Sequence, residues 1–172
     1  AASATLRLAE CQAALQQWSE SEKTFQSYLE RHRDSEVWFQ AQFGLGWVLE
    51  NQTRHDEAIV AYRKVIERHG GQTAARAQFQ IGECLFAQKK HDDAVRELLK
   101  VDILYGYPEW SAAALFEAGR CFELLSRPED ARTQFEQVKQ KYPDTQWANL
   151  ALQRLTAMGA KSPGQEPTPT GG

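Results

Sequence analysis

Polar loops divide the hydrophobic pattern of this chain into segments of about one helix each. The pattern predicts nine helices, at roughly 2–16, 19–33, 36–52, 55–69, 73–89, 91–104, 110–125, 128–141 and 144–158. No stretch shows the sustained apolar–polar alternation that is typical of a β-strand. The sequence therefore predicts an all-α fold.

The helical pattern recurs as a repeat. The segments LRLAEC, FGLGWV, FQIGEC and FEAGRC each contain a small residue, and these small residues are 37, 36 and 37 positions apart. They are Ala9, Gly46, Gly82 and Gly119. Twelve residues after each comes a second small residue (Ser21, Ala58, Ala94, Ala131), and four further on a bulky apolar one (Phe25, Tyr62, Leu98, Phe135). The constant interval inside each unit predicts fixed helical hairpins, with the variation confined to the loops between them.

Start and stop signals agree with these hairpins. The loops RHRDSE, RHGGQT, YGYPEW and KYPDTQ are rich in Gly, Pro, Asp and Ser, which end helices. Acidic pairs open three of the second helices, and Pro128 suits a first helical position. A single hairpin cannot bury both apolar faces, whereas stacked hairpins share a core. We therefore expect Gly46, Gly82 and Gly119 where two helices cross with no room for a side chain.

The repeated residues resemble the tetratricopeptide repeat pattern of Leu-Gly in a first helix, then Ala-x3-Phe and a closing Pro in a second. The matching residues are Leu45-Gly46, Ala58, Tyr62, Ala131, Phe135 and Pro143. The closing Pro is replaced by Arg33, Gly70 and Gly106 in the other units, and the first unit has Ala9 and Ser21 in place of Gly and Ala. The resemblance covers residues 2 to 158.

The resemblance implies a right-handed superhelical α-solenoid of four hairpins and a C-terminal capping helix. We expect repeats at about 2–35, 36–72, 73–109 and 110–143, with the capping helix at 144–158. Residues 159–172 are rich in Pro and Gly without apolar periodicity, which predicts a disordered tail. The 36–37-residue period and the junction KYPDTQWANLAL resemble bacterial cell-envelope members such as the TolA-associated coordinator and outer-membrane assembly lipoproteins. This favours a periplasmic or envelope location, with the cytoplasm as the alternative.

Composition narrows the class of partner. The net charge is -3 and no basic block occurs, so nucleic acid is not an expected partner. No apolar run approaches the roughly 18–20 residues that cross a bilayer, so membrane insertion is not expected either. The chain begins with Ala1 and has Met158 as its only Met, as expected of a processed chain or an excised piece.

The cysteines and histidines occupy repeat positions. Cys11, Cys84 and Cys121 each follow the small residue by two, where the remaining unit has Val48, so we interpret them as small core residues. Cys84 and Cys121 are expected to lie too far apart for a disulfide. The four histidines share their positions with Trp, Tyr or Pro of other units. Metal-ligand spacings, phosphate loops and nucleophile motifs are absent, so the sequence predicts no metal, no cofactor and no enzymatic activity.

The resemblance also implies a concave groove lined by the first helices. For Phe43, Phe79 and Phe116 two interpretations are open, a partner-binding floor or packing between hairpins, and we favour packing. Trp47 and Phe86 stand in rows that are otherwise charged or small, which favours contact with a partner. The candidate groove residues are Gln40, Phe43, Trp47, Glu50, Arg76, Phe79, Glu83, Phe86, Phe116, Arg120 and Glu123.

The predicted function is therefore a protein-interaction module or adaptor within a larger bacterial assembly. Its partner would be an amphipathic helix or an extended peptide with apolar and charged residues. The Lys and Asn with which chaperone adaptors bind a C-terminal carboxylate are missing from the corresponding rows. The alternative is a structural subunit that forms a homo-oligomer through Trp38, Trp110 or the ends of the array.

Overall fold

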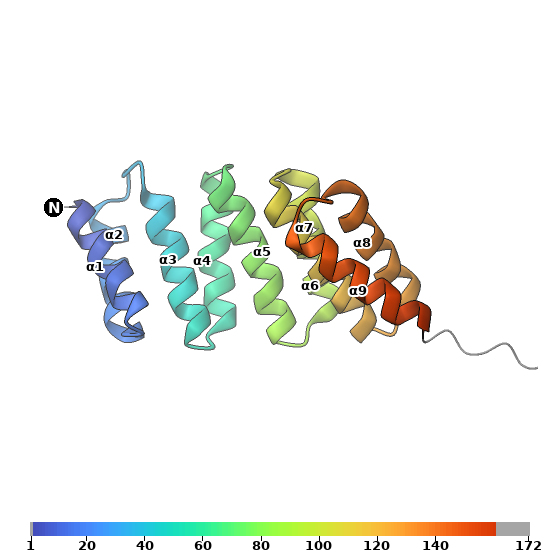
Figure 1. The fold of residues 1–172 in the computed structure, drawn as a ribbon. Helices are drawn as coiled ribbons and strands as arrows, with labels where there is room; N and C mark the ends of the chain where they lie inside the picture. The colour runs from blue at the N-terminus through green and yellow to red at the C-terminus, as the bar shows by residue number, and fades with distance from the viewer. Residues whose placement is uncertain (1, 161–172) are drawn as a thin grey trace, which may run out of the picture.

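The structure, a computed structural model, describes residues 2–160, which form nine helices stacked in a row (Figure 1). The helices are α1 (Ala2–Ala14), α2 (Trp18–Arg31), α3 (Trp38–Asn51), α4 (His55–Arg68), α5 (Gln72–Ala87), α6 (His91–Leu104), α7 (Pro108–Leu124), α8 (Pro128–Lys141) and α9 (Gln146–Ala160). This part of the chain contains no β-strand. The predicted all-α solenoid of helical hairpins is confirmed.

The helices form two rows. Each helix packs against the next one in sequence, and α1, α3, α5, α7 and α9 also contact one another in succession. Among the described residues the backbones of α2, α4, α6 and α8 do not approach one another in this way, and side-chain contacts such as that from Arg63 to Glu97 connect them. The array therefore curves with the odd-numbered helices on its inner side. We call these the inner helices and the even-numbered ones the outer helices.

Glycine at the hairpin crossings is required by close packing, as the repeat predicts. A methyl group on Gly46 would lie 2.6 Å from the Tyr62 ring, and one on Gly82 would lie 2.5 Å from Leu98. Gly119 stands in the same relation to Phe135, again at 2.5 Å. The crossing glycines of α3, α5 and α7 thus each receive the bulky residue of the following outer helix.

Each hairpin turn places a residue other than glycine in the left-handed backbone region. These residues are Gln16, Thr53, Lys89 and Ser126, with φ between 58° and 60°. The next amide donates back to the end of the inner helix, as from Arg54 N–H to the Leu49 carbonyl at 3.0 Å. This is the Schellman pattern of helix termination, which normally uses glycine. A side chain in this conformation costs about 1–2 kcal/mol, which the packing of the hairpin must offset.

Several helix ends differ from the predicted positions. Helix α3 begins at Trp38 instead of residue 36, and α7 begins at Pro108 instead of residue 110. Proline suits this first position because its missing N–H would have no partner inside the helix. Helix α9 runs to Ala160 and so includes the first two residues of the predicted tail. The rest of that predicted tail, 161–172, lies outside the described residues.

The prediction of a core position is wrong for Cys11. Cys84 and Cys121 are fully buried, but Cys11 is exposed. In α5 and α7 this helix face packs against the preceding outer helix, and in the described residues no helix precedes α1. The same face of α1 leaves Leu8 and Leu15 53% and 69% exposed.

No helix within residues 2–160 is both long enough and apolar enough to cross a membrane.

Candidate binding groove

Two pockets lie along the inner helices. The first, which we call the α3 pocket, has a volume of about 350 Å³ and is lined by Glu10, Ala13, Phe25, Gln40, Phe43, Gly44, Trp47, Thr73 and Arg76. The second, the α7 pocket, has a volume of about 330 Å³ and is lined by Phe79, Glu83, Glu109, Trp110, Ala113, Glu117, Gln146 and Trp147. Each pocket spans three inner helices, and α5 contributes to both.

The α3 pocket has an aromatic interior. Gly44 packs directly on the buried Phe25 ring, since a methyl group at this position would lie 2.4 Å from it. Trp47 packs edge-on against Trp18, with ring centroids 5.5 Å apart. The Arg76 guanidinium lies 4.5 Å from the centre of the Phe43 ring, which is a cation–π arrangement. Arg76 is exposed, so a ligand can reach its charge.

The α7 pocket combines aromatic rings with carboxylates. Trp110 contacts Phe79 at a centroid distance of 5.7 Å, and three glutamates, Glu83, Glu109 and Glu117, line the same pocket. Burial, together with the neighbouring carboxylates of Glu117 and Glu50, raises the pKa of Glu83 to about 7, and Arg120 opposes this shift. The pKa of Glu117 is also raised by burial. This pocket therefore disfavours negative charge.

Six of the predicted groove residues line these pockets. Gln40, Phe43, Trp47 and Arg76 line the α3 pocket, and Phe79 and Glu83 line the α7 pocket. The remaining five, Glu50, Phe86, Phe116, Arg120 and Glu123, line neither of them.

Three of those five hold helices together through charge. Glu50 accepts a hydrogen bond from the Tyr62 hydroxyl at 2.7 Å. Arg120 donates to Glu117, also at 2.7 Å, and Glu123 pairs with Arg154 of α9. These contacts link neighbouring helices or successive turns of one helix, so they give the side chains a structural role.

The other two are aromatic packing residues. Phe86 packs against His91 at a centroid distance of 5.3 Å, and Arg120 lies over its ring. Phe116 is 7% exposed and lies between Phe135 and Trp147. Phe43 and Phe79 are each 8% exposed, so burial of this column agrees with the packing interpretation. Phe43 and Phe79 nevertheless contribute to the pocket walls.

Sequence reasoning missed much of the α7 pocket, namely Glu109, Trp110, Glu117 and Trp147. A signal was available, because Thr73, Trp110 and Trp147 are separated by 37 positions each and all three line pockets. This row lies in the first turn of α5, α7 and α9, nine residues before the small residue in α5 and α7. It was not among the rows assigned to the groove.

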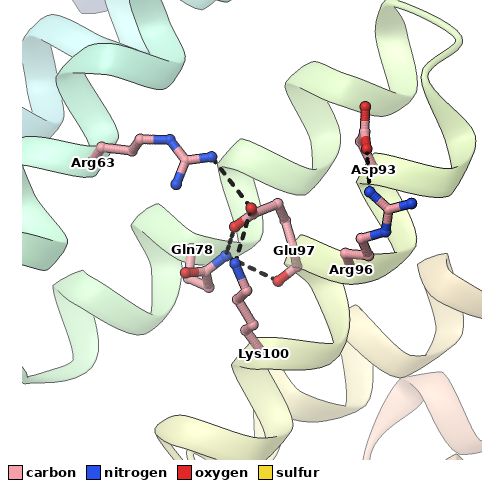
Figure 2. Close-up of polar contacts among 6 residues, drawn as sticks. All are labelled: Arg63, Gln78, Asp93, Arg96, Glu97 and Lys100. Carbon is pink, nitrogen blue, oxygen red and sulfur yellow. Dashed lines mark hydrogen bonds and ion pairs between the residues drawn. The ribbon is translucent and has the colours of Figure 1, made fainter.

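A further pocket, on the outer side, is lined largely by charged side chains, whose polar contacts Figure 2 shows. Buried Glu97 of α6 accepts hydrogen bonds from Gln78 at 2.7 Å, Lys100 at 3.0 Å and Arg63 at 3.2 Å. Burial opposes ionisation of Glu97, but these bonds hold its pKa below the ordinary value. Gln78 also donates to the Glu97 carbonyl, as the equivalent Gln42 does to Ala61. The network joins three helices, so we interpret it as structural.

Metal-ligating and thiolate chemistry depend on how the Cys, His, Asp and Glu side chains are placed within residues 2–160. No group of three or more His, Cys, Asp or Glu side chains is placed to hold a metal ion there. Burial raises the pKa of the Cys121 thiol to about 12 and raises that of Cys84 as well, so neither is a thiolate near neutral pH. His69 stacks on Phe39 with ring centroids 3.8 Å apart. Cys84, Cys121 and His69 therefore serve as packing residues, whereas Cys11 is exposed.

Comparison with solved structures supports the fold. A tetratricopeptide repeat protein from Parabacteroides merdae aligns with a TM-score of 0.75 at 14% identity, over 92% of this chain and 60% of that one. YrrB, a tetratricopeptide repeat protein with an unusual peptide-binding site, aligns at 0.67 and 21% identity, over 89% and 75%. PilF of Pseudomonas aeruginosa aligns at 0.67 and 17%, over 96% and 78%. The chain thus spans about three fifths of the Parabacteroides protein.

Sequence comparison is more specific about the repeats. No curated protein sequence matches the chain. Two family models described as tetratricopeptide repeat do match it, one at residues 14–73 and 43–104 and the other at 113–145. The first model alone covers more than half of the chain. The chain therefore belongs to the tetratricopeptide repeat family.

Proposed function

We propose that this chain is a non-catalytic adaptor that binds a peptide or a helix of another protein along its inner helices. Members of the family are generally scaffolds for protein–protein interaction. The observation that carries the proposal is the pair of pockets, each with aromatic walls and charged side chains. Aromatic residues and arginine dominate the energetics of protein interfaces.

The spacing of the pockets sets the size of the ligand. The α3 and α7 pockets are two helix spacings apart, and packed helices are about 8–10 Å from axis to axis, so the pocket centres are roughly 20 Å apart. An extended peptide covers that distance in about six residues and an α-helix in about 13. A partner segment of this length could place one side chain in each pocket.

The wider context follows from likeness to other proteins. YrrB is described as having a peptide-binding site, which supports a comparable role here. The 36–37-residue period and the junction before α9 favour a bacterial assembly in the cell envelope. We include the peptide partner, the envelope location and the bacterial assembly in this proposal.

Selection from a random 12-residue peptide display library tests peptide binding. The immobilised chain is compared with Trp47→Ala/Arg76→Ala, which alters the α3 pocket, and with Arg96→Ala as a control on an exposed outer helix. We expect the wild type and Arg96→Ala to enrich the same peptides and the double variant to lose them. Equal enrichment by all three would refute the groove assignment, and no enrichment by any would refute peptide binding.

A second candidate, self-association, is supported by the exposed face of α1 described above. Of the two tryptophans predicted to mediate self-association, Trp110 lies in the α7 pocket and Trp38 packs under Arg68 at 4.1 Å, so both already contact other parts of the chain. Size-exclusion chromatography with light scattering tests this candidate. A monomer at all concentrations rejects it, and a dimer that Leu8→Asp dissociates supports it.

A further inference from the structure

The α7 pocket lacks a counter-charge of its own. Its three carboxylates come from Glu83, Glu109 and Glu117, and its lining residues include no Lys or Arg. Arg120, outside the lining, hydrogen-bonds Glu117 at 2.7 Å. Arg154 of α9 also acts on Glu117, and Arg76 lies 5.7 Å from the centre of the Trp110 ring, so the negative charge of the three acids is only partly compensated.

One oxygen of these carboxylates has no partner. Glu83 Oε1 is sealed from solvent and accepts no hydrogen bond from any residue in 2–160. A buried carboxylate without donors is unfavourable, and a bound cation would remove that cost. Glu117 is only 7% exposed, so the charge on this wall also lies in a poorly hydrated place.

Aromatic rings form the rest of the wall. Phe79, Trp110 and Trp147 line the pocket. Trp is the aromatic side chain that attracts cations most strongly over its face. A volume of about 330 Å³ is at the lower end for small-ligand pockets, which suits a single side chain.

We propose that the α7 pocket receives an arginine side chain of the bound partner. A guanidinium is planar, stacks on aromatic rings and directs paired N–H donors at carboxylates, whereas a lysine ammonium is compact and strongly hydrated. This inference rests on the proposed function and names the chemistry of its ligand. The α3 pocket does not share the preference, because Glu10 and Arg76 in its lining balance each other.

The test uses fluorine NMR of the chain labelled with 5-fluorotryptophan. The five Trp residues give five resonances, which single Trp→Phe variants assign. N-acetyl-arginine amide is titrated against its lysine and citrulline counterparts, and citrulline keeps the arginine shape without the charge. We expect the Trp110 and Trp147 resonances to shift saturably with arginine, at least tenfold more weakly with citrulline, and more weakly with lysine than with arginine.

Variants test the carboxylates. Glu83→Gln keeps the side-chain shape, and we expect it to weaken arginine binding about tenfold, the effect of losing one charge-assisted hydrogen bond. Glu109→Gln should weaken it as well. Glu129→Gln on the exposed side of α8 is the matched control and should leave the affinity unchanged.

The outcomes separate this inference from the proposed function. Equal shifts with citrulline, equal or stronger binding of lysine, or no response at Trp110 and Trp147 overturns the arginine site, while peptide selection can still succeed. Failure of peptide selection together with saturable arginine binding would instead overturn the proposed function and leave the site standing. Unchanged affinity in Glu83→Gln would overturn the role of that carboxylate.

Discussion

The crossing of α5 with α6 offers a sharp test of the repeat geometry. In Gly82→Ala the new methyl group would lie 2.5 Å from both Cγ and Cδ2 of Leu98. Because Cγ is the branch point of the leucine, rotation of the side-chain end cannot remove the overlap. One of the two helices must shift.

The expected change in the free energy of unfolding is the difference between two opposing effects. Overpacking a core costs about 1–3 kcal/mol, whereas replacing Gly by Ala inside a helix stabilises by up to about 1 kcal/mol. The contact with Cγ puts the overpacking cost in the upper half of its range, so we expect a net loss of about 1–2 kcal/mol. For a chain of this length that corresponds to a decrease in Tm of roughly 2–8 °C.

Thermal unfolding followed by circular dichroism measures this change, with Gly159→Ala in α9 as the matched control. A methyl group on Gly159 meets nothing within 4 Å, so Gly159→Ala should have an unchanged or slightly higher Tm. Adding Leu98→Ala to Gly82→Ala should destabilise less than the sum of the single substitutions, because the two residues share one space. If the Tm of Gly82→Ala equals or exceeds that of Gly159→Ala, α5 and α6 do not cross as closely as described here.

Three further predictions address the turns, the α7 pocket and the thiols. Lys89→Gly should stabilise the chain by about 1 kcal/mol in urea unfolding, because glycine relieves the left-handed turn, whereas Lys89→Ala keeps the strain and should give no gain. The raised pKa of Glu83 gives stability that is complete below pH 4.5 and lost as pH rises through about 7, so Glu83→Gln should melt above wild type at pH 8 and lose that pH dependence. A thiol reagent should label one cysteine per native chain quickly, Cys11, and reach Cys84 and Cys121 only on unfolding; fast labelling of three would contradict the burial.

Repeat arithmetic predicts most of this fold because equivalent residues have equivalent neighbours. Gly46, Gly82 and Gly119 contact bulky residues 16 positions later in the hairpin, and the constant spacing in the sequence predicts these contacts. The same arithmetic fails at Cys11, since no helix precedes α1 within residues 2–160 to cover it as the equivalent Cys84 is covered. Whether this cysteine is buried thus depends on the position of its hairpin in the array and not on the residue type.

The groove was harder to predict because a pocket is formed by what three helices leave unfilled. The α3 pocket depends on Gly44, where other repeats carry Gln80 or Glu117, and a missing side chain gives no positive signal. Phe86 was a candidate for its size, but His91 and Arg120 occupy its surroundings. The repeat position of a residue indicates whether its side chain faces inward. It does not indicate whether other side chains of the chain already pack against it.

The span of the two pockets has a consequence for how the array would respond to a ligand. Helices α1 and α5 share no contact within the described chain, yet both line the α3 pocket, and α5 and α9 stand in the same relation at the α7 pocket. Repeat arrays unfold as a series of nearest-neighbour couplings, so an occupant of either pocket would add a coupling between next-nearest hairpins. Because α5 belongs to both pockets, ordering it at one would reduce the entropy cost of binding at the other. Two weak side-chain sites could in this way act as one cooperative site, with the ligand itself as the missing interhelical contact.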